Sequence, residues 1–249
     1  MKKYISIFEL FARNTIYKLW LILIAMGIVQ IVMFWRAMAE WAPIGVAEYG
    51  ILEAVEYYGL EWMVDRSNSA GFMGVAFVLM TAVLCWSGCN IGSKSNYTIQ
   101  RLQVSEKAVF IMQSLYNSFC YVLLLGVQLA VLLVQCRMFI EQSDNVTNQT
   151  VFLAFYRNEF MHSVLPMESG FRWFMNGVLI ICCGVAAALF TFLQRRGKTA
   201  WTLLVTVAAI LLGFVQELGN QLILVTAIVV FIIVGLATYF HVFQKNEDE

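Results

Sequence analysis

The sequence predicts an all-α integral membrane protein with six transmembrane helices. The 249-residue chain is 61% hydrophobic and only 13% charged, whereas about 25% of the residues in a soluble domain are charged. It has only two prolines, and long apolar runs recur along it. A run of about 20 apolar residues crosses the ~30 Å hydrocarbon core of a bilayer as a helix. Cations gather in alternate connecting segments, as they do in multi-pass membrane proteins.

The apolar runs define the spans and leave little chain outside them. We expect spans at about 20–35, 71–91, 108–136, 173–193, 199–215 and 221–243. No soluble domain, linker or internal repeat is visible, so residues 1–249 are interpreted as a single transmembrane domain.

Residues 3–19, ahead of the first span, have the pattern of an amphipathic helix. At about 100° per residue, one side of this helix carries Lys3, Arg13 and Lys18. The other side is mainly apolar and comprises Ile5, Phe8, Phe11, Ala12, Thr15, Ile16 and Leu19. A basic helix of this kind lies in the plane of a membrane surface, and the alternative is a charged entry to the first span.

Two longer segments are expected to be loops on one side of the membrane. The first, 36–70, is acidic and contains one apolar helical face that predicts a helix lying on the surface. That face comprises Ile51, Leu52, Val55, Tyr58 and Trp62. The second, 137–172, contains the aromatic stretch VFLAFYRNEFMHSVLPM, which predicts a short interfacial or re-entrant helix that stops near Pro166.

The charge distribution orients the chain. Most of the 16 Lys and Arg residues fall in segments on the side of the N-terminus, and most acids fall on the other side. The cations of that other side are Arg36, Arg66, Arg137, Arg157 and Arg172. By the positive-inside rule, both termini and the segment 92–107 are expected to be cytoplasmic.

The sequence lacks the residues that ion-coupled transport, catalysis, ATP hydrolysis or metal binding would need. The centres of the spans contain no Asp, Glu, Lys, Arg or His, which weighs against ion-coupled carriers and intramembrane enzymes. The chain has no glycine-rich phosphate loop, so we do not expect it to hydrolyse ATP. Glu159 and His162 could face one ligand, but two residues make a poor metal site. The six cysteines are interpreted as membrane-buried apolar residues rather than disulfides or metal ligands.

Span three carries a polar stripe within about 80° of a helical wheel. The stripe comprises Gln113, Asn117, Tyr121, Gln128 and Gln135. A carboxamide that faces lipid leaves its donors and acceptors unpaired, at a cost of about a few kcal/mol. The stripe is therefore expected to face either other helices or a hydrated substrate path.

Span five carries small and hydroxyl residues on one face. The face comprises Thr199, Thr202, Thr206, Ala209, Gly213 and Gln216. Small residues allow two helices to approach closely, so this face suits packing within the chain or a dimer interface.

The segment 92–107 reads GSKSNYTIQRLQVSEK, and a short helix is expected over about 98–103. Ile99 and Leu102 form a small apolar ridge with Arg101 between them. Such a ridge suits docking into a groove of a soluble partner, although a polar hairpin tucked against the bilayer is the alternative. Ser105 is placed to cap the start of span three.

This arrangement resembles the permease subunits of type-2 ABC exporters. Bacterial permeases of this kind read Tyr-Thr-x-x-Arg-Leu-x-Val-Ser-Glu at the same place. The matching residues here are Tyr97, Thr98, Arg101, Leu102, Val104, Ser105 and Glu106. The resemblance implies that residues 1–19 form an elbow helix and that Ile99 and the matching residues belong to a coupling helix that docks on the ATPase. One departure is the connection between spans five and six, where the family often has re-entrant helices and this chain has only QELGN.

The resemblance implies a permease that is not itself an enzyme and holds no cofactor. Two separate ATP-binding subunits would bind ATP and Mg²⁺, and a second copy or a homologous permease would complete the pathway. The expected location is the bacterial plasma membrane, the expected cargo is an amphipathic peptide, lipid-like or drug-like molecule, and no nucleic acid is involved. The alternative function is a membrane sensor or assembly protein whose outer loops bind a ligand.

Overall fold

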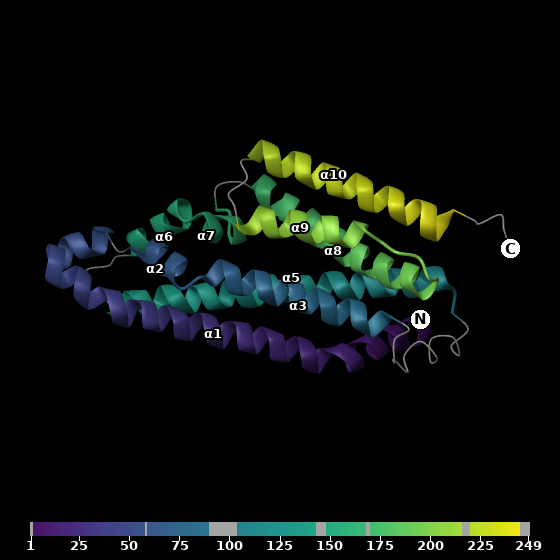
Figure 1. The fold of residues 1–249 in the computed structure, drawn as a ribbon, viewed down its shortest axis with the longest axis horizontal. Helices are drawn as coiled ribbons and strands as arrows, with labels where there is room; N and C mark the ends of the chain where they lie inside the picture. Colours follow the sequence, from purple (N-terminus) through teal and green to yellow (C-terminus); the bar gives the residue numbers. More distant parts are fainter. Residues whose placement is uncertain are drawn as a thin grey trace.

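A computed structural model describes residues 2–57, 59–89, 104–142, 148–167, 170–215 and 220–244. The regular elements in these ranges are all helices, gathered in an elongated bundle (Figure 1). Their bounds are α1 Lys2–Tyr57, α2 Leu60–Arg66, α3 Ser69–Gly88, α5 Glu106–Gln142, α6 Asn148–Arg157, α7 Glu159–Val164, α8 Gly170–Arg195, α9 Thr202–Val215, α10 Asn220–Thr238 and the π-helical segment η1 Tyr239–Phe243.

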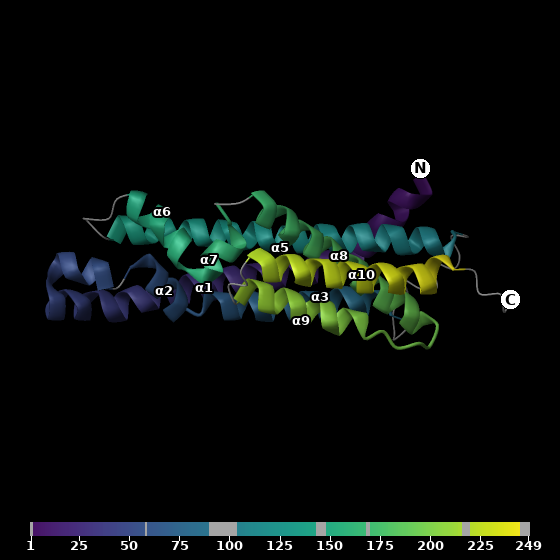
Figure 2. The same ribbon diagram turned by 90° about the horizontal axis from the view of Figure 1, so that it is seen from above.

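The long helices lie along one axis and alternate in direction. Both chain ends, the start of α5 and the end of α8 lie at the same end of the bundle, which we call the terminal end (Figure 1). The short helices α2, α6 and α7 lie at the opposite, distal end (Figures 1 and 2). The chain thus passes along the bundle through α1, α3, α5, α8, α9 and α10 in turn.

Among the residues that the structure describes, five helical segments are long and apolar enough to cross a bilayer. They are Ser6–Ala39, Ser69–Ser87, Glu106–Gln142, Gly170–Arg195 and Gln221–Phe243. These segments confirm an all-α, membrane-embedded protein. The fifth predicted span, 199–215, is shorter than expected because α9 begins only at Thr202. Its 14 residues rise about 21 Å, against a hydrocarbon core of about 30 Å.

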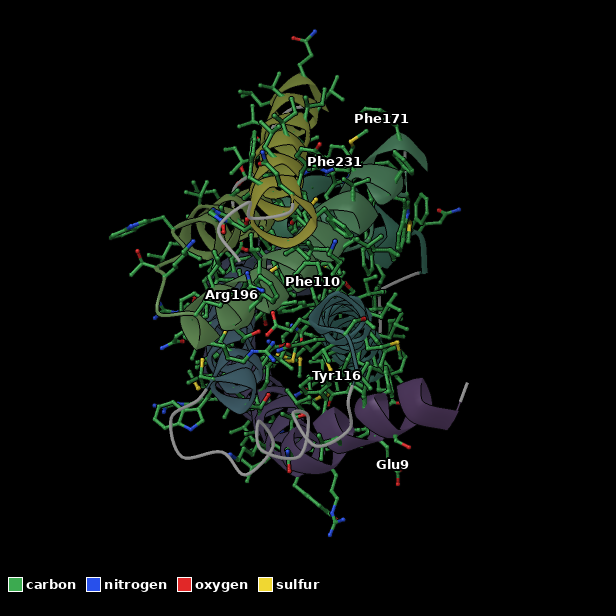
Figure 3. All side chains as sticks on the ribbon, turned by 90° about the vertical axis from the view of Figure 1, so that its right-hand side faces the viewer. Glu9, Phe110, Tyr116, Phe171, Arg196 and Phe231 are labelled. Atoms are coloured by element: carbon green, nitrogen blue, oxygen red, sulfur yellow. The ribbon has the colours of Figure 1, made fainter. Side chains whose placement is uncertain are left out.

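The predicted first span lies within the apolar segment Ser6–Ala39, but the segment 36–70 that follows it is more helical than predicted. α1 is one helix from Lys2 to Tyr57, and α2 follows after Gly59. Residues 37–57 are rich in Ala and Glu, which favour helix. The loop was predicted because the segment is acidic. The amino-terminal part of α1, which carries Glu9, runs across the terminal end rather than along the bundle (Figure 3).

The amino-terminal part of α1 is anchored on α5 by aromatic packing. The ring of Tyr116 lies 5.2 Å from Phe8 and 6.3 Å from Phe11, and its hydroxyl shares a hydrogen bond with Thr15. Ile7 is fully buried although the predicted apolar face omitted it, whereas Ile16 on that face is 42% exposed. The buried face is therefore turned slightly from the predicted one.

The segment 137–172 is more helical than predicted. α5 continues to Gln142, and the predicted short helix is present as two, α6 and α7, with α7 ending ahead of Pro166. Asn158 separates them and caps α7 by accepting a hydrogen bond from the amide of Met161 at 2.9 Å. Its side-chain amide also donates to Asp65 Oδ1 at 2.7 Å, which joins α7 to α2. Burial raises the pKa of Asp65, and the hydrogen bond from Asn158 partly offsets that rise.

α8 is the central helix and α10 is peripheral. The most apolar stretch of α8 is 72% buried, whereas that of α10 is 22% buried. Small residues on α8 permit this position, because Ala186, Ala187 and Ala188 are fully buried and Gly184 lies against α5. Helices can approach this closely only where side chains are small.

Candidate functional site

The predicted docking residues fall only partly within the described structure. Tyr97, Thr98, Ile99, Arg101 and Leu102 lie outside the described residues.

The docking residues that the structure does describe lie directly ahead of α5 and at its first position. Val104 is half-buried, and Ser105 is exposed directly ahead of α5. The Ser105 carbonyl accepts hydrogen bonds from the amides of Ala108 and Val109 at 3.0 and 3.2 Å, so Ser105 occupies the capping position.

The first turn of α5 is attached to two other elements at the terminal end. Glu106 forms an ion pair with Arg196, just beyond the end of α8, and the Arg196 guanidinium lies 4.5 Å from the centre of the Phe192 ring. Lys107 Nζ lies 5.7 Å from the centre of the Phe243 ring, at the end of η1. Because the ion pair is largely exposed, it contributes about 0–1 kcal/mol to stability. It joins the first turn of α5 to the residue just beyond α8, and Figure 3 shows Arg196 near Phe110 of α5.

Hydrogen bonds join α3, α5 and α8 just inside this end. Arg195 Nη2 donates to Gln113 Oε1 at 3.3 Å, which joins α8 to α5. Cys89 Sγ donates to Gln194 Oε1 at 2.6 Å, which joins the residue after α3 to α8. The start of α5 thus lies at a junction between the helices that precede and follow it.

The polar stripe of α5 faces other helices along its whole length. Its members, Gln113, Asn117, Tyr121, Gln128 and Gln135, are each at most 1% exposed. Asn117 Nδ2 donates to the Gly184 carbonyl at 3.4 Å, and the Tyr121 hydroxyl lies 2.8 Å from Thr81 Oγ1. These contacts join α5 to α8 and to α3. Of the two alternatives, they favour helix packing over a hydrated path.

A buried reciprocal pair of hydrogen bonds between α1 and α5 involves a residue that the sequence analysis did not select. Gln30 of α1 is fully buried, and its side chain exchanges two hydrogen bonds with Gln128, at 2.9 and 3.0 Å. Gln30 also donates to the Ser69 carbonyl at 3.1 Å, and Gln135 donates to Ser69 Oγ at 3.3 Å. The sequence did contain a signal for this contact. Gln30 is a carboxamide in an otherwise apolar span, and such a group requires a hydrogen-bond partner.

The face of α9 that carries small and hydroxyl residues packs against other helices of this chain. Thr206 is buried and donates to the Thr202 carbonyl at 2.8 Å, and Gly213 is buried. α9 packs on α3, α7, α8 and α10. Thr199 lies ahead of α9 and is exposed, and Gln216 falls outside the described residues.

An apolar cavity lies between α3, α5, α8 and α9. Met73, Phe77, Ile180 and Phe214 contribute to its lining, and its volume is about 20 Å³. A volume of about 10–15 Å³ holds one water molecule, so this cavity is too small for a peptide or a lipid.

A second polar cluster, also missed from the sequence, joins α7 to α8 at the distal end. Arg172 is buried and donates to Ser163 Oγ at 3.2 Å, while Asn176 Nδ2 donates to the Ser163 carbonyl at 2.9 Å. These contacts stabilise the packing of a short helix on the central one.

Glu159 and His162 differ in their surroundings, although they lie on one short helix. Glu159 is exposed, whereas His162 is buried with its ring 6.2 Å from that of Tyr156. Within the described ranges, no group of three or more His, Cys, Asp or Glu side chains is placed to hold a metal ion. The six cysteines are free and buried.

Comparison with known proteins identified no relative, since no family model, curated protein or solved structure matches the chain.

Proposed function

We propose that this chain is the permease subunit of an ATP-driven ABC exporter whose cargo is an amphipathic peptide or a lipid-like or drug-like molecule. The observation that carries the proposal is the arrangement of the terminal end. Both chain ends lie there (Figure 1). The start of α5 lies there too, directly after the segment that resembles a coupling helix, and is attached to α8 through Glu106 and Arg196.

The proposed topology has six crossings with the terminal end in the cytoplasm. Lys18 and Lys107 lie toward the terminal end of α1 and α5, and Arg196 and Lys198 directly follow the end of α8 there. The positive-inside rule assigns this end to the cytoplasm. The fifth crossing is α9, whose 14 residues rise about 21 Å. The residues 198–201 ahead of it lie at the membrane surface, and the bilayer would thin locally to match the short helix.

The amino-terminal part of α1 supports the same orientation. It crosses the terminal end at a steep angle to the bundle (Figure 3), as an elbow helix lying on the membrane surface would. Its exposed Arg13 and Lys18 would face anionic headgroups of the cytoplasmic leaflet of a bacterial plasma membrane.

The energy source in this proposal is outside the chain. Two ATP-binding subunits that bind ATP and Mg²⁺ would dock on residues 97–106, and a second copy or a homologous permease would complete the pathway. Closure of the ATPases would displace the start of α5. The Glu106–Arg196 ion pair would then pass that displacement to α8, the helix with the most buried span.

Arg101→Glu tests this docking surface. Reversal of the charge at the centre of the ridge should reduce the amount of ATPase subunit that co-purifies with the chain by at least about tenfold, a loss of about 1.4 kcal/mol. Insertion of the chain into the membrane should be unchanged. The measurement is the ratio of the two subunits after affinity purification in mild detergent.

The matched control is Lys18→Glu, which reverses an exposed cation of α1 near the same end of the bundle. It should leave the subunit ratio unchanged. Equal ratios for Arg101→Glu and the wild-type chain would contradict the proposed docking surface.

A further inference from the structure

The extended residues between α8 and α9 leave a gap in the surface of the bundle near the terminal end. α8 ends in a Schellman motif: Gly197 has a φ of 69°, and the amide of Lys198 donates to the Leu193 carbonyl at 2.9 Å. The chain then runs extended to Trp201 before α9 begins (Figures 1 and 2). Because α9 is short, its first turn starts well inside the bundle instead of at its end.

A niche of about 230 Å³ occupies this gap. Phe190 and Leu204 contribute apolar surface to it, and Gln194, Lys198 and Thr199 contribute polar groups. Trp201 also lines the niche and is 73% exposed. Trp side chains of membrane proteins favour the headgroup level, where one part of the ring is apolar and the N–H is hydrated.

Lys198 is the cation of this niche, and the two arginines shortly before it in the chain already have partners. Arg195 is hydrogen-bonded to Gln113, and Arg196 is paired with Glu106. Lys198 is exposed and has no ion-pair partner among the residues that the structure describes. Within the same ranges, the amides of Thr199 and Ala200 have no hydrogen-bond acceptor. At the headgroup level these amides are free to donate to a lipid phosphate in place of water.

We propose that the niche binds one anionic phospholipid of the leaflet at the terminal end. The lipid phosphate would accept from Lys198 and the free amides, and an acyl chain would lie along Phe190 and Leu204. The cation and the interfacial Trp fit a lipid headgroup, and the apolar wall fits an acyl chain. A free phosphate would contact only the cation. This inference rests on the membrane embedding of the chain and not on its proposed transport function.

The test is lipid binding by the purified chain, measured by native mass spectrometry with phosphatidylglycerol and phosphatidylcholine. The wild-type chain should retain phosphatidylglycerol in preference to phosphatidylcholine. Lys198→Ala should weaken phosphatidylglycerol binding about fivefold, since one interfacial cation contributes about 1 kcal/mol. Lys198→Arg should restore it, and Trp201→Ala should weaken both lipids.

Arg137→Ala is the control, because it removes an exposed cation near the distal end of α5 that does not line the niche. It should leave phosphatidylglycerol binding unchanged. Equal retention of the two lipids by the wild-type chain, or equal losses in Lys198→Ala and Arg137→Ala, would overturn the proposal. Displacement of the lipid by millimolar inorganic phosphate would also overturn it, because the niche would then be a simple anion site.

Discussion

Gly184→Ala should destabilise the bundle by about 2 kcal/mol or more, the range found for overpacked cores. A Cβ at this position of α8 would lie 2.1 Å from Ser118 Oγ and 2.7 Å from the Ser118 backbone nitrogen. The hydroxyl can rotate away, but the backbone of α5 cannot move without separating the two helices. Separation would also lengthen the hydrogen bond from Asn117 to the Gly184 carbonyl, which is already 3.4 Å. Thermal unfolding of the purified protein in detergent measures the effect.

Two other glycines on the same pair of helices provide the controls. A Cβ at Gly126 of α5 or at Gly177 of α8 would meet no atom within 4 Å. Alanine favours helix over glycine by about 1 kcal/mol, so Gly126→Ala and Gly177→Ala should be neutral or stabilising. If Gly184→Ala melts at the same temperature as these controls, α5 and α8 are not packed as closely as described.

Gln128→Leu should cost about 1–3 kcal/mol, because it leaves the buried Gln30 side chain without its main partner. Gln30→Leu should have a similar cost for the same reason. The double substitution should be less destabilising than the sum of the two, since removal of both partners leaves no unpaired carboxamide. We expect a coupling free energy of at least about 0.5 kcal/mol.

The four proteins of this cycle are compared by thermal unfolding in one detergent. Gln149→Leu provides a reference, because Gln149 is exposed at the start of α6. Additive losses would contradict the proposed pairing of α1 with α5. A Gln128→Leu protein as stable as the reference would contradict it as well.

The sequence located most of the spanning helices because their apolar runs are long and uninterrupted. α3, α5, α8 and α10 with η1 start within about three residues of the predicted spans, an offset that is usual for helix ends. A surface helix was predicted within 36–70 from the apolar face that ends at Trp62, but the continuation of α1 to Tyr57 was not, because the acidic residues there were interpreted as a loop.

The sequence predicts that the buried carboxamides form hydrogen bonds, but it does not predict which residues they bond to. Burial requires a partner for every carboxamide, so the stripe on α5 was expected to face another helix or water. That Gln128 pairs with Gln30, 98 residues away, depends on the three-dimensional arrangement of α1 and α5. The late start of α9 likewise depends on the Schellman motif at Gly197, which directs the chain away from α8 before a new helix can form.

Purification of the tagged chain from its native membrane, followed by a native mass measurement, tests the proposed function most directly. The account predicts a complex of two permease subunits, identical or homologous, with two P-loop ATPase subunits. Recovery of the chain in a functional state without any nucleotide-binding subunit would contradict the account and would favour a membrane sensor or assembly protein.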